Sequence, residues 1–215
     1  MVRLRSALHA SLAAICLASF AGASLPARAE TIVDEWAAVK PPAPVELKKV
    51  KIDTKTTAFL VLDMVPLTCN PERRPRCLAS LPAMQKFLGE ARKHNVMVVY
   101  SLAGNAKASE ILAPVAPLGT EPVVTSVANK FIRTDLDKIL KDKGITTLIT
   151  VGTAAHGAVL YTASEAAFLG YKVIVPVDGA SAENTYAEQA VAWTLANAPG
   201  VGANTTLTKY DLIEF

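Results

Sequence analysis

Residues 148–181 read LITVGTAAHGAVLYTASEAAFLGYKVIVPVDGAS, and this stretch decides the fold. An apolar run of strand type ends in a turn at Gly152, and residues 157–169 then have the pattern of a helix. A second apolar run follows at residues 172–177 and ends near Asp178. The pattern predicts a βαβ unit with two parallel strands, and it places a candidate active site in the first turn.

Earlier residues repeat this alternation of apolar runs and helical patterns. Residues 57–62 (TAFLVL) form a continuous apolar run that ends at Asp63, which is typical of a buried parallel strand. Residues 96–101 (VMVVYS) predict a second strand, and residues 81–94 between them have apolar side chains at helical spacing. The alternation predicts a three-layer αβα sandwich with a mostly parallel sheet. Ligands of such sheets bind beyond the carboxyl ends of the strands, which here lie at Asp63, Ser101, Gly152 and Asp178.

The first 29 residues are typical of a secretory signal peptide. Arg3 and Arg5 form the charged start, residues 12–23 form a short apolar core, and Ala27-Arg28-Ala29 is a small-x-small cleavage site. An uncleaved anchor helix is the alternative, although the apolar core is short for a membrane span. We expect a mature chain that starts near Glu30 and lies in the periplasm or is secreted, with no membrane attachment after cleavage.

Cleavage also changes the charge balance and the expected domain organisation. The signal contains three of the 22 basic residues and no acidic residue, so 19 basic and 19 acidic residues remain. No basic surface dominates, which argues against a nucleic-acid partner. Residues 30–56 are expected to form an N-terminal arm, rich in proline and lysine, that packs on the domain or on a neighbouring subunit. Residues 57–215 are long enough for one domain with a full core.

Two cysteines remain after cleavage, Cys69 and Cys77, in the proline-rich segment CNPERRPRC. In an oxidising compartment such a pair predicts a disulfide. The alternative is two free thiols, one of which is catalytic. The same segment contains Arg73, Arg74 and Arg76, which form either a solvated charged surface or a gate for a carboxylate substrate.

Three motifs resemble the isochorismatase-like (cysteine hydrolase) superfamily. They are TAFLVLDM at residues 57–64, KFIRTDLDKIL followed by GITTLITVG at residues 130–152, and the stretch from Val151 to Ala182. The resemblance implies a Rossmann-like fold with a six-stranded parallel sheet covered by helices on both faces. It also implies hydrolysis of a small-molecule substrate, assembly into a homo-oligomer, and a cis peptide between Thr153 and Ala154.

The family's usual catalytic set is an aspartate, a lysine and a nucleophilic cysteine. Asp63 matches the aspartate, Lys130 is the nearest substitute for the lysine, and the cysteine position falls on Ala158. A methyl group cannot attack a carbonyl carbon, so a covalent route through Ala158 is excluded. One branch of the superfamily has a small residue there and cleaves a vinyl ether by proton transfer and attack of water. In that case Asp63 is a general acid or base, which requires burial to raise the pKa of its carboxyl.

Substrate binding is expected at the turn before the helix. The backbone N–H groups around Thr153, Ala154, Gly157 and Ala158 can stabilise an anion whatever their side chains are. His156 in the same turn is either a further substrate contact or a helix cap. Neither a metal nor another cofactor is expected.

Non-catalytic roles remain as alternatives for the two charged residues. Asp63 could only cap N–H groups at a strand end, and Lys130 could be a solvated lysine. Two functions therefore stay open: a hydrolase that uses Asp63 and water, or a non-catalytic descendant that binds a small anion or a partner protein. A hydrogen bond between the Lys130 ammonium and the Asp63 carboxylate favours the hydrolase, whereas a solvent-facing Lys130 favours the binding protein.

Overall fold

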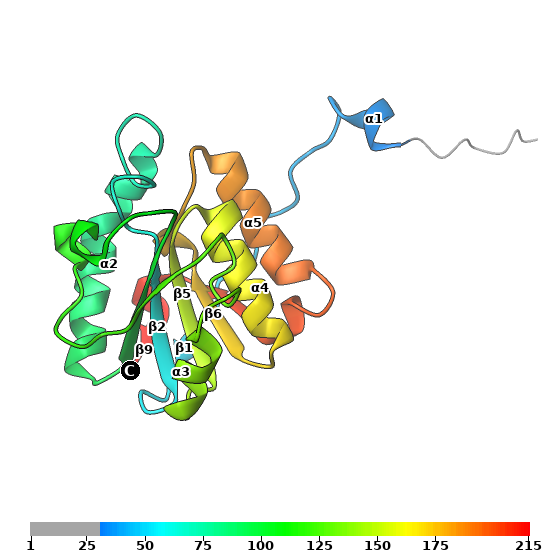
Figure 1. Ribbon diagram of the computed structural model, residues 1–215. Helices are drawn as coiled ribbons and strands as arrows, with labels where there is room; N and C mark the ends of the chain where they lie inside the picture. The colour runs from blue at the N-terminus through cyan, green and yellow to red at the C-terminus, as the bar shows by residue number, and fades with distance from the viewer. Residues whose placement is uncertain (1–30) are drawn as a thin grey trace, which may run out of the picture. The chain divides into compact units, whose positions relative to one another are not determined.

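The computed structural model describes residues 31–215 (Figure 1). The expected signal peptide lies outside the described residues. The chain divides into two units, residues 1–41 and residues 42–215. In the first unit the structure describes the short helix α1 (Ile32–Glu35). The second unit contains the sheet and the helices α2 to α5.

A parallel sheet forms the centre of the second unit. Its strand order is β4-β3-β2-β5-β6-β8, and every neighbouring pair is parallel. A short seventh strand, β7 (Ala180–Ser181), pairs with the end of β5. The sheet confirms the predicted parallel α/β fold. The bounds of the six main strands are Thr57–Leu62 (β2), Met97–Leu102 (β3), Val123–Thr125 (β4), Thr147–Thr153 (β5), Lys172–Pro176 (β6) and Thr205–Thr208 (β8).

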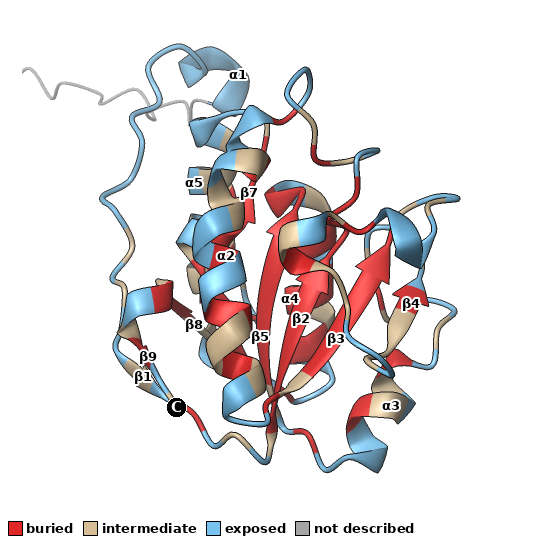
Figure 2. Ribbon diagram, turned by 90° about the vertical axis from the view of Figure 1, so that its left-hand side faces the viewer, coloured by how far each residue is buried: buried red, intermediate tan, exposed pale blue. Residues whose placement is uncertain are grey.

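Helices cover both faces of the sheet. The two faces are distinguished along β2, because alternate side chains of a strand point in opposite directions. Leu60 and Leu62 pack in one core with the helices α3, α4 and α5, whereas Phe59 and Val61 pack in a second core with α2. Figure 2 shows the strands between these helices as buried along most of their length. The helix bounds are Pro75–Lys93 (α2), Leu136–Asp142 (α3), Leu160–Phe168 (α4) and Thr185–Asn197 (α5).

The helix α2 begins six residues earlier than the apolar pattern predicts. Apolar periodicity starts at Leu81, but the helix already begins at Pro75, a residue suited to the first helical position because its missing N–H has no partner there. Most side chains of the first turns are exposed or partly exposed and do not follow the apolar pattern. The extra turns bring Cys77, which is buried, into the helix.

The strand order determines where a ligand can bind. The chain runs from β2 outward through β3 to β4, and then returns to β5 on the other side of β2. Connections therefore leave β2 and β5 in opposite directions, and the carboxyl ends at such a switch point are where α/β sheets usually bind ligands. The two strands are paired up to Leu62 and Gly152. Gly152 has a φ of 126°, and a Cβ atom there would lie 2.1 Å from the Leu62 carbonyl oxygen, so only glycine permits this close approach.

Residues 45–52 of the expected arm pack on the domain. Lys48 donates its N–H to the carbonyl oxygen of Leu207 over 2.9 Å, and Thr208 donates its hydroxyl to the carbonyl oxygen of Lys48 over 2.7 Å. The strand β1 (Val50–Lys51) then forms a parallel two-stranded sheet with β9 (Ile213–Glu214). Sequence patterns do not reveal this sheet, because two residues are too few to show a period.

None of the helices in the described part of the chain combines the length and hydrophobicity that crossing a bilayer requires.

Candidate active site

Asp63 lies at this switch point, directly after β2. The backbone turns sharply here, with a φ of 55°, and only 4% of the residue is exposed. The Ser101 hydroxyl at the end of β3 donates to Asp63 Oδ1 over 2.7 Å. Lys130 Nζ lies 2.7 Å from the other carboxylate oxygen, Oδ2. Both oxygens of the buried carboxylate therefore have a hydrogen-bond donor.

Lys130 is held by three parts of the fold. Its side chain is fully buried, so it is not a solvated lysine. Besides Asp63, Nζ points to the carbonyl oxygens of Leu102, at the end of β3, and Ser126, at 3.4 and 3.3 Å. The backbone N–H of Lys130 donates to Thr162 Oγ1 of α4 over 3.2 Å. The contacts with Leu102, Ser126 and Thr162 thus hold the Lys130 ammonium beside the Asp63 carboxylate.

Burial has the largest effect on the ionisation of Asp63. It disfavours the charged form and raises the pKa of the carboxyl above its ordinary value. The Lys130 ammonium, the Ser101 hydroxyl and the Arg74 guanidinium act in the opposite direction without cancelling the effect of burial. A carboxyl with a raised pKa keeps its proton to a higher pH than an exposed carboxyl does, which suits a general acid.

The turn after β5 lies beside Asp63, because β2 and β5 are paired up to their carboxyl ends. The peptide between Thr153 and Ala154 is cis, as the family resemblance implies. A π-helical turn, Ala155–Val159, precedes α4. Within it Gly157 donates its N–H to the Ala154 carbonyl oxygen over 3.0 Å, so this N–H is used by the turn itself. Ala158 is 3% exposed and packs in the same core as Leu62.

The disulfide loop forms the rim of the site. Cys69 and Cys77 are bonded, which confirms the predicted disulfide and removes the alternative of a free catalytic thiol in this pair. Between them Arg74 is buried, and its Nη1 donates to the Thr68 carbonyl oxygen over 3.0 Å. The Thr68 hydroxyl in turn donates to the Asp63 carbonyl oxygen. The loop is therefore linked directly to the backbone of Asp63.

Arg74 reaches across the rim to Glu183, which follows β7. Its Nε and Nη2 atoms lie 2.8 and 2.7 Å from the same oxygen, Oε1. The other oxygen, Oε2, lies 3.5 Å from Nε2 of His156, a partly exposed residue of the π-helical turn. The three arginines of the disulfide loop thus differ in burial and in their partners. Arg74 is buried, whereas Arg73 is exposed and Arg76 pairs with Glu188 at the surface.

Sequence analysis missed four residues that organise this site. Ser101 was recognised only as a strand end, and its contact with Asp63 depends on the pairing of β2 with β3. Thr68 and Glu183 lie outside the quoted motifs, and Thr162 lies within the third motif, where the sequence does not show its contact with Lys130. Their roles come from contacts between segments that are distant in the chain or in irregular loops.

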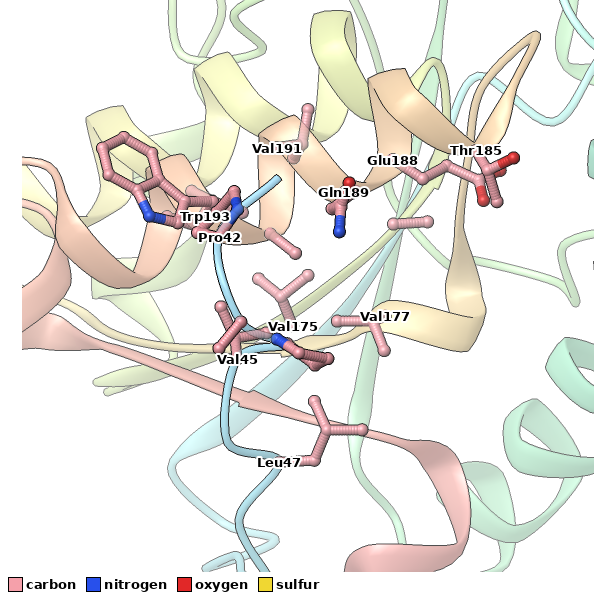
Figure 3. A pocket seen from close by; sticks show the side chains of 15 residues that line it. Pro42, Val45, Leu47, Val175, Val177, Thr185, Glu188, Gln189, Val191 and Trp193 are labelled. Atoms are coloured by element: carbon pink, nitrogen blue, oxygen red, sulfur yellow. The ribbon is translucent and has the colours of Figure 1, made fainter. Parts of the chain in front are cut away.

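A separate apolar pocket lies between the arm and α5. It has a volume of about 310 Å³ and shares no lining residue with the Asp63 site. It is lined by Pro42, Val45 and Leu47 of the arm, by Trp193 of α5 and by Val175 of β6 (Figure 3). The pocket has no group suited to acid–base chemistry apart from Glu188, which is bound to Arg76.

Within residues 31–215 no group of three or more histidine, cysteine, aspartate or glutamate side chains is arranged to hold a metal ion.

The sequence matches the family model for the isochorismatase domain over residues 57–208. The chain belongs to the isochorismatase family. Among curated proteins no sequence matches it significantly. The assignment to the family therefore rests on the match to the family model. The matched residues include Asp63, Lys130 and the whole turn after β5.

Solved structures of isochorismatase-family proteins share the fold. A cysteine hydrolase from Pseudomonas syringae pv. phaseolicola is 20% identical, with 78% of this chain and 94% of that chain covered and a TM-score of 0.65. An isochorismatase-like hydrolase from Alkaliphilus metalliredigens is 24% identical over 73% of this chain and 87% of that chain, with a TM-score of 0.65. N-carbamoylsarcosine amidase from Thermoplasma acidophilum is 21% identical over 73% and 97%, with a TM-score of 0.61. At these identities the likeness establishes the isochorismatase-like fold.

Proposed function

We propose that this isochorismatase-family protein is a hydrolase that acts on a small molecule outside the cytoplasm. Its chemistry would use Asp63 and water, without a covalent cysteine intermediate. One observation carries the proposal: Lys130 Nζ lies 2.7 Å from Asp63 Oδ2, with both side chains buried at the carboxyl ends of the strands. A non-catalytic protein has no need of a buried ion pair at this position, because replacing such pairs by apolar residues often costs no stability.

The roles of the two residues follow from their contacts. In hydrolysis the Asp63 carboxylate would take a proton from water as the water oxygen attacks the substrate, and the carboxyl would then give that proton to the leaving group. For a vinyl ether the protonated carboxyl would act first, by protonating the alkene carbon. Water would then add to the oxocarbenium carbon and return a proton to the carboxylate, and the resulting hemiketal would break its C–O bond to release an alcohol and a carbonyl compound. Lys130 would keep the carboxylate oriented and would balance the charge that changes on it.

The turn after β5 would bind the substrate. Thr153 and Ala154 are buried beside Asp63, and α4 begins a few residues later, so the backbone there favours negative charge. Ala158 provides a methyl group where the family resemblance places the nucleophile, which leaves water as the nucleophile. His156 would contact the substrate from the outer side of the turn, since it is partly exposed.

Other features support the proposed location and partners. The disulfide between Cys69 and Cys77 is typical of oxidising compartments, in agreement with export by the signal peptide. Large apolar side chains are exposed on α4 and α5, which supports assembly into a homo-oligomer. They are Tyr161, Phe168, Tyr186 and Trp193. No nucleic-acid partner is proposed, because the chain without its signal has no excess of basic residues.

The test is a hydrolysis screen with small vinyl ethers, amides and carbamoyl compounds. We expect a substrate whose turnover falls by about 10²- to 10⁴-fold in Asp63→Asn, the usual contribution of a general acid or base. Asp178→Asn is the matched control, because Asp178 also follows a sheet strand and has a raised pKa through burial, but accepts the Tyr210 N–H instead of contacting Lys130. Equal turnover by Asp63→Asn and the unaltered protein would remove Asp63 from the mechanism. Ligand retention without turnover would support the non-catalytic descendant.

A further inference from the structure

Arg74 is a buried cation at the entrance to the site. Its side chain is 6% exposed, although it belongs to a surface loop. Asp63, Lys130 and Ala158, which lie further in, are almost completely buried. Arg74 is close enough for its charge to act on Asp63, and it is connected to Asp63 through Thr68. The Arg74 guanidinium is therefore a positive charge beside Asp63 that a bound substrate can contact.

The partner of Arg74 is more exposed than Arg74 itself. The Glu183 side chain is 32% exposed, and a single oxygen, Oε1, accepts the Nε–H and also lies 2.7 Å from Nη2. A guanidinium can instead bind a carboxylate through two parallel hydrogen bonds, one to each oxygen. The present contact leaves this fork incompletely matched, because Oε2 is directed toward His156. A carboxylate supplied from solution can therefore replace Glu183 with an equal or better fit.

The neighbouring pair is a natural comparison. Arg76 lies two residues away and pairs with Glu188, but the Arg76 side chain is 44% exposed and has no contact with the Asp63 site. Glu188 also accepts the Ala182 N–H and receives Arg76 through both of its oxygens. This pair is already bidentate and solvated, so it offers a ligand no unfilled position.

We propose that Arg74 selects substrates that have a carboxylate, and that Glu183 occupies the position of that carboxylate in the structure. The substrate carboxylate would displace Glu183 from Arg74, which opens the rim between the disulfide loop and the segment after β7. The bond to be cleaved would then lie deeper, beside Asp63. The substrate class is a small organic acid with a hydrolysable group. The claim that this acid is hydrolysed rests on the proposed function, whereas its binding to Arg74 does not.

Binding of matched acids and amides tests the proposal without turnover. The probes are isobutyrate with isobutyramide and benzoate with benzamide, titrated into the full chain while the Nε–H signal of Arg74 is followed by NMR. We expect the acids to shift this signal and the amides to leave it unchanged. Glu183→Gln removes the competing charge, so the acids should bind about tenfold more tightly to it, as expected when a charged hydrogen-bond partner is replaced by a neutral one. Arg76→Gln is the control, and it should bind the acids as the unaltered protein does.

Several results would overturn the proposal. Acids and amides with equal affinity would do so, as would acid affinity that is unchanged in Glu183→Gln. In Arg74→Gln the acids should no longer raise the thermal stability, as they should in the unaltered protein. If that variant does not fold, the Glu183→Gln comparison alone decides. Asp63-dependent hydrolysis confined to uncharged compounds would contradict the inference and leave the hydrolase proposal intact. Tight acid binding without any hydrolysis would support the role of Arg74 and contradict the hydrolase proposal.

Discussion

Lys130 Nζ and Asp63 Oδ2 lie 2.7 Å apart, and both side chains are almost completely buried. Taking two charges out of water costs about as much free energy as their attraction returns, so such a pair contributes little net stability. Removing one partner is different, because the remaining charge is left buried and unpaired. The pair therefore predicts that the effect of replacing one residue on the free energy of unfolding depends strongly on whether the other is present.

Single substitutions in this pair should be more harmful than the double substitution. We expect Asp63→Asn and Lys130→Met each to lower the free energy of unfolding by about 3–5 kcal/mol, and the double variant to recover most of that loss. Urea denaturation of the four proteins measures the coupling. The exposed pair Lys138–Asp142 on α3 is the control, for which the same cycle should give less than about 1 kcal/mol. Additive losses at Asp63 and Lys130 would show that the two charges do not depend on each other.

Asp63 should titrate in the opposite direction from Asp137. Burial raises the pKa of Asp63, whereas the Lys141 ammonium lowers the pKa of Asp137 on the surface of α3. NMR of the side-chain carboxyl carbons should place the midpoint of Asp63 above the ordinary aspartate value and that of Asp137 below it. A midpoint for Asp63 below the ordinary value would mean that Lys130 outweighs burial, and the carboxyl would then be a poor general acid.

The same shift has a consequence for stability. A raised pKa means that the folded protein binds the Asp63 proton more tightly than the unfolded chain does. The stability contributed by Asp63 is therefore full below the unfolded pKa and is lost as the pH rises through the folded pKa. We expect the free energy of unfolding to fall over this window relative to the Asp63→Asn/Lys130→Met double variant, which lacks both charges. A rise over the same window would contradict the assignment.

The disulfide should stabilise the rim without controlling the fold. The loop between Cys69 and Cys77 is short, with a sequence separation of eight residues. Closing a loop of this size is worth about 2.5 kcal/mol in the chain-entropy account. The Cys69→Ala/Cys77→Ala double variant should lose approximately this amount, measured by urea denaturation under non-reducing conditions. A loss below about 0.5 kcal/mol would show that the packing of α2 alone holds the loop in place.

Thr162 should be needed to position Lys130. Its hydroxyl oxygen accepts the Lys130 N–H, and it donates to the Ala128 carbonyl oxygen over 3.3 Å. Thr162→Val removes both contacts at a fully buried position, so we expect a loss of about 1–3 kcal/mol in the free energy of unfolding and a change in the titration of Asp63. Thr162→Ser retains the hydroxyl and should restore the titration. A valine variant with an unchanged Asp63 midpoint would show that the loop holds Lys130 by other contacts.

Features that depend on residues close together in the sequence could be predicted, whereas features that depend on residues distant in the chain could not. The βαβ unit, the strand end at Asp63 and the disulfide follow from local patterns, and the structure has all three. The choice between a solvated and a buried Lys130 could not be made locally, because that residue is buried by β3, α4 and its own loop together. The Arg74–Glu183 pair joins residues 109 positions apart and has no sequence signature. Local chemistry thus predicts the scaffold, whereas the entrance to the site depends on long-range contacts.

Ala158 gives the most direct test of the turn as a site for reactive groups. A thiol introduced by Ala158→Cys would lie just before α4, where the positive end of the helix dipole stabilises a thiolate. We expect its alkylation by iodoacetamide to have a pH midpoint below the ordinary cysteine value of about 8.5. Ala83→Cys is the control, since Ala83 is exposed in the middle of α2 and its thiol should be alkylated with the ordinary pH midpoint. All variants would carry Cys16→Ser so that one free thiol is present. A midpoint at the ordinary value, or equal midpoints for the two variants, would show that the turn does not stabilise negative charge.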